Sequence, residues 1–287
     1  SCQAIKIMTG AVLPKGADAV VMVEDTRIKS EILNPKSETN SKSQMPNSKQ
    51  KKEFIEIFRE VKPCENVRYR GEDIKEGELV IHKGTLLKSA HIGILASLGK
   101  ANVQVPRRPK VAILATGDEV VAVGAYCNAP LPPGKIRNSN SYSLYAQVLR
   151  LPAVPLLLGI AKDNKKEIEQ RIRKGLRADM LLVSGGVSVG DYDFVKDVLA
   201  DLGMDMKFWK VAIRPGRPLV FGTIKGIPVF GLPGNPVSSM VSFEVFVRPA
   251  ILKLLGSGTD KKDAEAILEE DIKKKKGLRY FLRACTI

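Results

Sequence analysis

From residue 110 onward, short apolar runs alternate with segments whose apolar residues recur every three or four positions. The runs 111–115, 154–160 and 180–183 are typical of buried strands, whereas 141–150 and 164–177 are typical of helices with one apolar face. This alternation predicts an α/β domain, in which a mostly parallel sheet is covered by helices on both sides in three layers.

The same pattern continues after residue 194, where four apolar residues share one face of a predicted helix: Val195, Val198, Leu199 and Leu202. The segment 207–213 is predicted to be a strand. Two apolar runs joined by Lys225 and Gly226 predict a β-hairpin that adds an antiparallel edge to the sheet. The helix predicted at 237–255 contains Pro249, so we expect it to bend or break there.

The rest of the chain divides into three further regions by composition. Residues 1–65 have β-like runs at 19–23 and 54–58 and are predicted to be a partial β-rich domain. Residues 66–106, with a helix candidate at 91–98, are predicted to be part of an α+β domain. The α/β domain then covers 107–255, after the extended connector "PRRP", and 256–287 is predicted to begin a C-terminal β domain.

Composition narrows the class of protein. Residues 27–52 have seven Lys/Arg and two Glu, a large share of the net charge of +15, and few large apolar groups, so they are predicted to be a disordered insertion. Aromatic residues make up only 6% and are not interleaved with basic ones, which argues against nucleic-acid binding. No apolar run is long enough for a membrane helix and no leader is evident, so we expect a cytoplasmic protein. The four cysteines are too widely spaced to predict a zinc site or disulfides.

Candidate chemistry gathers where the predicted strands end. "TGDE" (116–119), Asp163, "SGGVSVGDYD" (184–193) and "GLPGNPVSS" (231–239) each follow a strand. In open α/β sheets, ligands bind beyond the carboxyl ends of the strands. Each segment also has a purely structural interpretation, because Gly-Asp is common in turns and Ser238 or Ser239 could cap a helix.

The glycine-rich segment 184–193 suits an anion, because glycines let backbone N–H groups approach it closely. Asp191 is best explained as a helix cap, whereas Asp193 is better explained as a ligand of phosphate-bound Mg²⁺. A basic turn, "KFWKVAIRPGRP", follows with four cations and no acid. Arg214 and Arg217 flank its Pro-Gly and are predicted to clamp an oxyanion, although a solvated basic strand would have the same composition.

Taken together, these segments resemble the molybdopterin molybdenumtransferases of the MoeA type, also found as the E domain of gephyrin. The resemblance covers almost the whole chain outside 27–52 and runs through these blocks: "IKIMTGAVLPKGADAVV", "NVRYRGEDI", "LASLG", "RPKVAILATGDE", "IRNSNSY", "LLVSGGVSVGDYDFVK", "KVAIRPGRPLVFG" and "PVFGLPGNPVSS". It implies a MoaB/Mog-like α/β domain and a chain that is truncated at both ends relative to the family.

The resemblance also implies a reaction, in which molybdate is inserted into adenylylated molybdopterin with Mg²⁺ and AMP is released. The full-length protein would be a homodimer whose site faces the first two domains of the partner. Carried over by motif, the catalytic residues would be Thr9, Asp73, Asp118, Glu119, Asp163, Asp193, Arg214 and Arg217, with Asp193 and Glu119 on the metal side. The ligand-binding residues would be Thr116, Gly117, Asn140, Ser184, Gly185, Gly186, Ser188, Gly190, Pro233, Gly234, Asn235, Pro236 and Ser238.

Two departures leave other functions open. The family usually has Lys where this chain has Arg214 and Arg217, and "RLPAVP" breaks the usual helix-to-strand turn. The alternatives are a non-catalytic scaffold or molybdopterin-binding protein of the same fold, and the related molybdopterin adenylyltransferase. The adenylyltransferase lacks the "MTGA" and "GEDI" blocks that are present here.

Overall fold

The structure is a computed structural model, and it describes residues 4–32, 51–126, 129–186, 194–258, 265–282 and 284. The chain divides into two compact units, 1–80 and 81–287. Among the described residues, no helix is both long and apolar enough to cross a bilayer.

The second unit is built on a six-stranded sheet with the order β6-β3-β7-β11-β10-β8. Its strands are β3 (Lys110–Thr116), β6 (Val154–Ala161), β7 (Met180–Ser184), β8 (Asp205–Trp209), β10 (Val220–Ile224) and β11 (Ile227–Leu232). β3 pairs in parallel with β6 and β7, and β7 pairs in parallel with β11. The carboxyl ends of β3, β7 and β11 therefore meet at one edge of the sheet.

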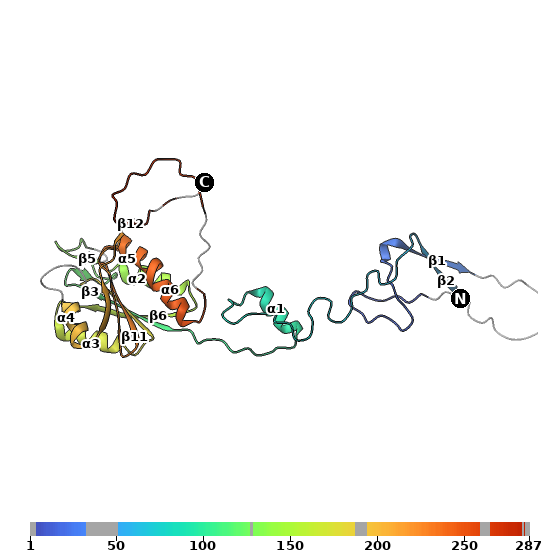
Figure 1. Cartoon of the computed structure of the whole chain (residues 1–287), viewed down its shortest axis with the longest axis horizontal. Helices are drawn as coiled ribbons and strands as arrows, with labels where there is room; N and C mark the ends of the chain where they lie inside the picture. Colours follow the sequence, from blue (N-terminus) through green and yellow to red (C-terminus); the bar gives the residue numbers. More distant parts are fainter. Residues whose placement is uncertain are drawn as a thin grey trace, which may run out of the picture. The chain divides into compact units, whose positions relative to one another are not determined.

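Helices cover both faces of this sheet (Figure 1). One face packs on α3 (Lys165–Gly175) and α4 (Phe194–Asp201) through a buried cluster that includes Leu114, Ile168 and Leu199. The other packs on α2 (Asn140–Leu149) and on a helix formed by α5 (Pro236–Ser242), η2 (Phe243–Val247) and α6 (Arg248–Leu254). Successive strand residues point to opposite faces, so the continuous apolar runs within β3 and β7 supply both clusters, and the predicted three layers are confirmed.

The predicted hairpin and the predicted antiparallel edge of the sheet are both confirmed. Lys225 and Gly226 both have positive φ, at 49° and 81°, as the tight two-residue hairpin turn requires. β10 is antiparallel to β11 and to β8, and β8 occupies the edge of the sheet. The predicted strand 207–213 is interrupted because Lys210 has φ of 71°, and β9 (Ile213–Arg214) then starts separately.

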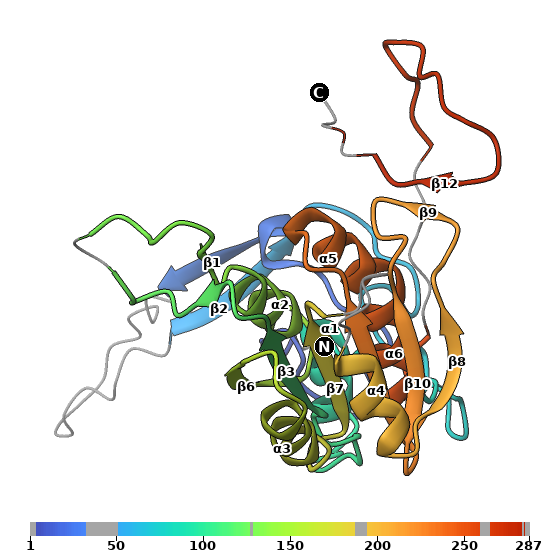
Figure 2. The same cartoon turned by 90° about the vertical axis from the view of Figure 1, so that its left-hand side faces the viewer.

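The helix from residue 236 to 254 does not break at Pro249. Its middle, η2, is a π-helical segment that ends at Val247, two residues before the proline. Proline has no N–H and its ring clashes with the carbonyl of a regular helix four residues back, and a wider turn relieves both. In the C-terminal part, β12 (Arg279–Tyr280) pairs in parallel with β9 (Figure 2).

The first unit contains η1 (Val23–Asp25) and a two-stranded ribbon, β1 (Thr26–Ile32) with β2 (Lys51–Ile57). The prediction of disorder for 27–52 is therefore wrong at both ends, which pair as strands, while 33–50 lie outside the described residues. The strand predicted at 19–23 is also wrong, because the backbone N–H of Val20 bonds the carbonyl of Glu65 in a loop. The predicted helix at 91–98 is confirmed as α1 (Ser89–Ser97), which belongs to the second unit.

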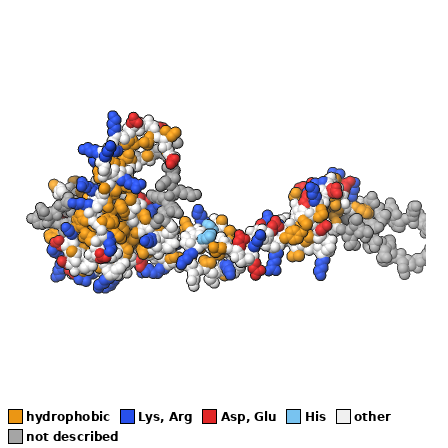
Figure 3. Space-filling view, in the orientation of Figure 1, with side chains coloured by type: hydrophobic (Ala, Val, Ile, Leu, Met, Phe, Trp, Pro, Cys, Tyr) orange, Lys and Arg blue, Asp and Glu red, His pale blue; other side chains and the backbone are white. Residues whose placement is uncertain are grey.

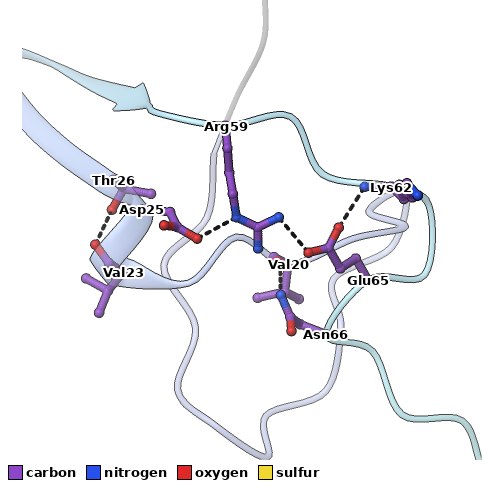
Figure 4. Close-up of polar contacts among 8 residues, drawn as sticks. All are labelled: Val20, Val23, Asp25, Thr26, Arg59, Lys62, Glu65 and Asn66. Carbon is purple, nitrogen blue, oxygen red and sulfur yellow. Dashed lines mark hydrogen bonds and ion pairs between the residues drawn. The ribbon is translucent and has the colours of Figure 1, made fainter.

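Arg59 holds the loops of the first unit together (Figure 4). Its guanidinium lies 2.6 Å from Asp25 Oδ2 and 2.7 Å from Glu65 Oε1, and Glu65 Oε2 accepts from the backbone N–H of Lys62. The hydrogen bond from the Lys62 N–H contributes most to lowering the pKa of Glu65, and the bond from Arg59 lowers it further. Nearby, Asn66 Nδ2 donates to the carbonyl of Val20 at 2.8 Å. These contacts tie together segments separated by more than thirty residues along the chain.

Asp179 fixes the start of the α/β sheet. Its carboxylate accepts two bonds from Arg107, at 2.5 and 2.6 Å, and one from the backbone N–H of Lys110 at 2.8 Å. The hydrogen bond from Arg107 contributes most to lowering the pKa of Asp179, and the backbone N–H of Lys110 lowers it further. The predicted connector at 106–109 is thereby fastened to the loop before β7.

We predict that Asp179→Asn lowers the free energy of unfolding by about 1 kcal/mol, because charge-assisted bonds at a partly exposed site are replaced by weaker ones. Since the folded pKa is depressed, this stabilisation is present above the unfolded pKa and is lost as the pH falls through the folded value. Urea unfolding at pH 7 and at pH 3 measures both. Glu169→Gln removes the exposed pair with Arg173 and serves as the control. Equal effects of the two substitutions at pH 7 would contradict the role of Asp179.

Candidate active site

A pocket of about 70 Å³ lies at the edge where β3, β7 and β11 end. It is lined by Ala115, Thr116, Glu119, Val120, Ile136, Arg137, Asn138, Ser139, Asn140, Ser184, Gly185, Gly234 and Pro236. Seven of these were predicted as site residues: Thr116, Glu119, Asn140, Ser184, Gly185, Gly234 and Pro236. The pocket is smaller than typical sites for whole ligands, so it would enclose only one part of a nucleotide-sized molecule.

Asn140 connects two of the strand ends. It is the first residue of α2, and its Nδ2 donates to Ser184 Oγ at 2.9 Å and to the carbonyl of Gly234 at 2.8 Å. Its Oδ1 is buried and has no hydrogen-bond partner among the described residues. The side chain therefore fixes the wall of the pocket and leaves one acceptor unsatisfied.

The glycines after β7 permit a close approach of two strand ends. Gly185 has φ of 93°, and a Cβ there would lie 2.6 Å from the carbonyl oxygen of Thr116. At Gly186, with φ of 61°, a Cβ would lie 2.6 Å from Val195 Cγ2 and 2.9 Å from Thr116 Oγ1. Thr116 is 1% exposed, and its hydroxyl lacks a partner among the described residues. Only glycine fits this backbone.

The turn after β11 places Gly234 beside Gly185, whose Cα lies 3.9 Å from an ideal Cβ at Gly234. Asn235, and neither Ser238 nor Ser239, caps the helix, because Asn235 Oδ1 accepts from the backbone N–H of Ser238 at 3.2 Å. Pro236 is the first helical residue, where the missing N–H costs nothing. Pro233 is buried behind this turn.

Asp118 and Asp163 hold the ends of β3 and β6 together. Asp163 Oδ2 accepts from the backbone N–H of Asp118 at 3.1 Å, and Asp118 Oδ1 accepts from that of Asp163 at 3.2 Å. Neither residue lines the pocket. The structure thus gives this pair a role in fixing the turn that presents Glu119.

Glu119 lies at the pocket with an exposed side chain. Gly117 has a φ of 131°, and an ideal Cβ at that position would lie only 2.4 and 2.7 Å from the two carboxylate oxygens of Glu119. The carbonyl of Glu119 accepts from the N–H of Ile136 at 2.8 Å, next to the short pairing of β4 (Val120–Val121) with β5 (Ile136–Arg137). In the described part of the chain, no three His, Cys, Asp or Glu side chains cluster as metal ligands.

Arg214 and Arg217 lie on one exposed turn, which the N–H of Val211 closes onto the carbonyl of Arg217 at 3.0 Å. The turn packs on α5, because a Cβ at Gly216 would lie 2.7 Å from Ser242 Oγ and 3.5 Å from the carbonyl of Ser238. Neither arginine has an acidic partner among the described residues, and neither lines the pocket. The turn adjoins the helix whose first residue, Pro236, does line it.

Sequence reasoning missed Arg137, which both lines the pocket and anchors a loop. Its guanidinium donates to the carbonyls of Val123 at 2.9 Å and Tyr126 at 3.1 Å, and also to that of Ala125. Asn138 and Ser139 were missed as well, and the only available signal was their place in "IRNSNSY", next to Asn140.

Other predicted site residues cannot be compared with this pocket. Ser188, Gly190, Asp191 and Asp193 lie outside the described residues. Thr9 and Asp73 belong to the first unit, where Thr9 is exposed and both carboxylate oxygens of Asp73 accept from Arg68, at 2.8 and 2.9 Å.

We predict that Asn140→Ala lowers the free energy of unfolding by about 1–2 kcal/mol, because two hydrogen bonds across the pocket wall are lost. Thermal unfolding measures this change. Ser143→Ala is a control on the same helix, because among the described residues its hydroxyl donates to the carbonyl of Asn140 alone, at 3.0 Å. If both variants unfold like the parent protein, the bridge from Asn140 does not hold the strand ends together.

Comparison with known proteins matches two regions of the chain to described families. Residues 1–99 match the family described as the MoeA N-terminal region (domain I and II), and residues 112–253 match the one described as a probable molybdopterin binding domain. The chain belongs to the MoeA family. Every pocket-lining residue lies within the second matched region.

Relatives of this MoeA-family chain agree over nearly its whole length. It is 39% identical over 284 residues to the molybdopterin molybdenumtransferase of Bacillus subtilis, covering 98% of this chain and 61% of the relative. It is 38% identical to that of Haemophilus influenzae, covering 99% and 64%. The chain thus spans somewhat over three fifths of the length of these relatives.

The fold agrees as well. The crystal structure of a molybdopterin biosynthesis moeA protein from Pyrococcus horikoshii OT3 has a TM-score of 0.69 and 30% identity, covering 96% of this chain and 61% of that one. A second crystal structure, of a molybdopterin biosynthesis moea protein from Pyrococcus horikosii, has a TM-score of 0.64 and 34% identity, covering 86% and 55%.

Proposed function

We propose that this chain takes part in molybdenum cofactor biosynthesis as a molybdopterin molybdenumtransferase, which inserts molybdate into adenylylated molybdopterin and releases AMP. One observation carries the proposal: the strand-end residues Thr116, Ser184, Gly185 and Gly234 line a single pocket together with Asn140, the first residue of α2. Relatives named molybdopterin molybdenumtransferase match 98–99% of the chain. We also expect a cytoplasmic location.

The pocket suits a phosphate-bearing part of the substrate. Gly185 and Gly234 have no side chains to keep a ligand from the backbone, and the buried Thr116 hydroxyl, which lacks a partner among the described residues, can donate to a phosphate oxygen. The buried Asn140 Oδ1 also lacks a partner there, but it only accepts, so it calls for a hydroxyl or N–H group of the ligand. Leaving such atoms unsatisfied costs about 1–3 kcal/mol each, which a bound polar ligand would recover. Ligand binding and the rigidity of the pocket wall thus involve the same residues.

The donors present fit Mg²⁺. Glu119 supplies an exposed carboxylate at the pocket, and Mg²⁺ is usually held by one or two carboxylates together with substrate phosphates. We propose Glu119 and Asp193 as its protein ligands. Bound there, Mg²⁺ would neutralise the charge that develops on a phosphoanhydride as it is cleaved. Glu119 would be positioned for this by the mutual bonds of Asp118 and Asp163.

The turn with Arg214 and Arg217 is proposed to receive molybdate. Both guanidinium groups are exposed and lack an acidic partner among the described residues, and planar guanidinium groups match tetrahedral oxyanions. Gly216 packs against α5 and fixes the direction of the turn. Ser238, on the first turn of α5, is proposed to act with these arginines.

We further propose that the full-length protein acts as a homodimer, with Thr9 and Asp73 reaching the partner's site. The small volume of the pocket supports this proposal, because the rest of a pterin nucleotide would need further walls.

On the face seen in Figure 3, Lys and Arg side chains of the α/β unit are interspersed with apolar and neutral ones. The basic side chains on this face do not form the continuous track that nucleic acid would need, which supports our expectation that the chain does not bind it.

AMP release from adenylylated molybdopterin, in the presence of Mg²⁺ and molybdate, tests the proposal. We expect Glu119→Gln to slow AMP release by at least tenfold, because its carboxylate is lost, and Glu169→Gln, on the exposed face of α3, to leave it unchanged. A protein that binds adenylylated molybdopterin but never releases AMP would instead be a scaffold. One that forms adenylylated molybdopterin from ATP would be an adenylyltransferase.

A further inference from the structure

A second, polar pocket lies between α2 and the helix 236–254, on the helices that also form the first site. It has a volume of about 330 Å³ and is lined by Gln147, Arg150, Leu151, Glu244 and Arg248. α2 begins at Asn140, whose side chain lines the first pocket, and Gln147 lies seven residues further along the same helix. The second pocket shares no lining residue with the first.

The charges of this pocket favour an anion. Arg150 is exposed and has no acidic partner among the described residues. Arg248 Nε lies 3.9 Å from Glu244 Oε2, at the limit for an ion pair. Two guanidinium groups thus face the pocket with one carboxylate, and forked guanidinium donors pair best with oxyanions.

Gln147 gives the pocket a second requirement. The residue is only 8% exposed, and its Nε2 donates to the carbonyl of Met240 at 3.2 Å and to Glu244 Oε1 at 3.1 Å. Because both bonds need an amide NH₂, the orientation of the amide is fixed. Its Oε1 is buried without a partner among the described residues, so the pocket wall lacks a hydrogen-bond donor.

We propose that this pocket binds a small oxyanion that itself carries a proton, namely phosphate or a protonated phosphate monoester. Arg150 and Arg248 would bind the unprotonated oxygens, while the P–O–H group would donate to the acceptors that Gln147 and Glu244 present. The adjacent π-helical segment widens the helix where the pocket lies, and such segments are frequent at functional sites. The proposal does not depend on the function proposed for the first pocket.

Phosphate and sulfate separate this proposal from a merely basic surface. Near neutral pH, inorganic phosphate carries at least one P–O–H, whereas sulfate carries none, and the two ions have nearly the same shape. Two guanidinium groups alone would bind both. A wall that also needs a donor binds phosphate more tightly, because sulfate would bring oxygen lone pairs against the acceptors.

The test is a titration of the whole chain with sodium phosphate and with sodium sulfate at constant ionic strength, followed by the NMR signal of the Gln147 side-chain amide. That signal is local to the second pocket and is assigned by its loss in Gln147→Met. We expect phosphate to shift it with at least fivefold higher affinity than sulfate. Arg150→Gln should weaken phosphate binding at least fivefold, and Arg177→Gln, an exposed arginine outside the pocket, should not change it.

Methyl phosphate, titrated at pH 5.5, identifies the source of the phosphate group, since its monoanion still carries a proton below a pKa of about 6. Affinity equal to that of phosphate indicates a monoester, and weaker binding indicates free phosphate. Equal affinities for phosphate and sulfate, or phosphate binding unchanged by both Arg150→Gln and Arg248→Gln in folded protein, would overturn the proposal. Because AMP release reports on the first pocket, either proposal can fail without the other.

Discussion

Gly185→Ala should lower the free energy of unfolding by about 3 kcal/mol and abolish binding of adenylylated molybdopterin. The new Cβ would lie 2.6 Å from the backbone carbonyl oxygen of Thr116, which cannot rotate away as a side chain could. At φ of 93° the alanine is strained even without that contact. The ends of β3 and β7 would have to separate, and both of them line the pocket. Urea unfolding and a direct binding titration measure the two effects.

Gly203→Ala is the matched control. Gly203 also has a positive φ, of 76°, but no heavy atom lies within 4 Å of its ideal Cβ. Only the left-handed conformation is penalised there, at a cost of about 1 kcal/mol. Binding should be unaffected, because Gly203 follows α4 and does not line the pocket. If Gly185→Ala is no more harmful than Gly203→Ala, the close approach of the two strand ends does not shape the site.

Arg217→Ala should slow molybdate-dependent AMP release by about 100-fold, because preorganised charges that stabilise a reacting oxyanion typically contribute about 3 kcal/mol. The apparent affinity for molybdate should fall with it. Arg217→Lys keeps the charge and should recover most of the rate at saturating molybdate. Steady-state rates over a range of molybdate concentrations separate these effects.

Arg177→Ala removes an exposed guanidinium outside the pocket and should leave AMP release unchanged. A loss of rate in Arg217→Ala that excess molybdate fully reverses would indicate binding alone. If Arg217→Ala releases AMP as fast as the parent at every molybdate concentration, Arg217 has no part in handling the oxyanion.

The sheet could be predicted from sequence because its strands are buried on both faces. Runs such as those that form β3 and β7 leave no polar position, so only a sheet covered on both sides explains them. The same reasoning brought Thr116, Ser184 and Gly234 to one edge, since each follows a strand of known direction. Neither step required knowledge of side-chain contacts.

Features that depend on tertiary contacts escaped prediction. That Asn140 bonds Ser184 and the carbonyl of Gly234 could not be read from the sequence, because the three lie far apart along the chain. Arg137 is one cation among many in the sequence until the carbonyls of the 123–126 loop surround it. The ribbon of β1 and β2 was missed because its polar composition resembles a flexible segment, and pairing between its two ends is not local information.

The position of a bound nucleotide tests the central proposal most directly. A crystal structure of the chain soaked with AMP or adenylylated molybdopterin should show the phosphate group beside Gly185 and Gly234, within hydrogen-bonding distance of the Thr116 hydroxyl. Density for the phosphate elsewhere, for example between Arg150 and Arg248 with the first pocket filled only by water, would contradict it.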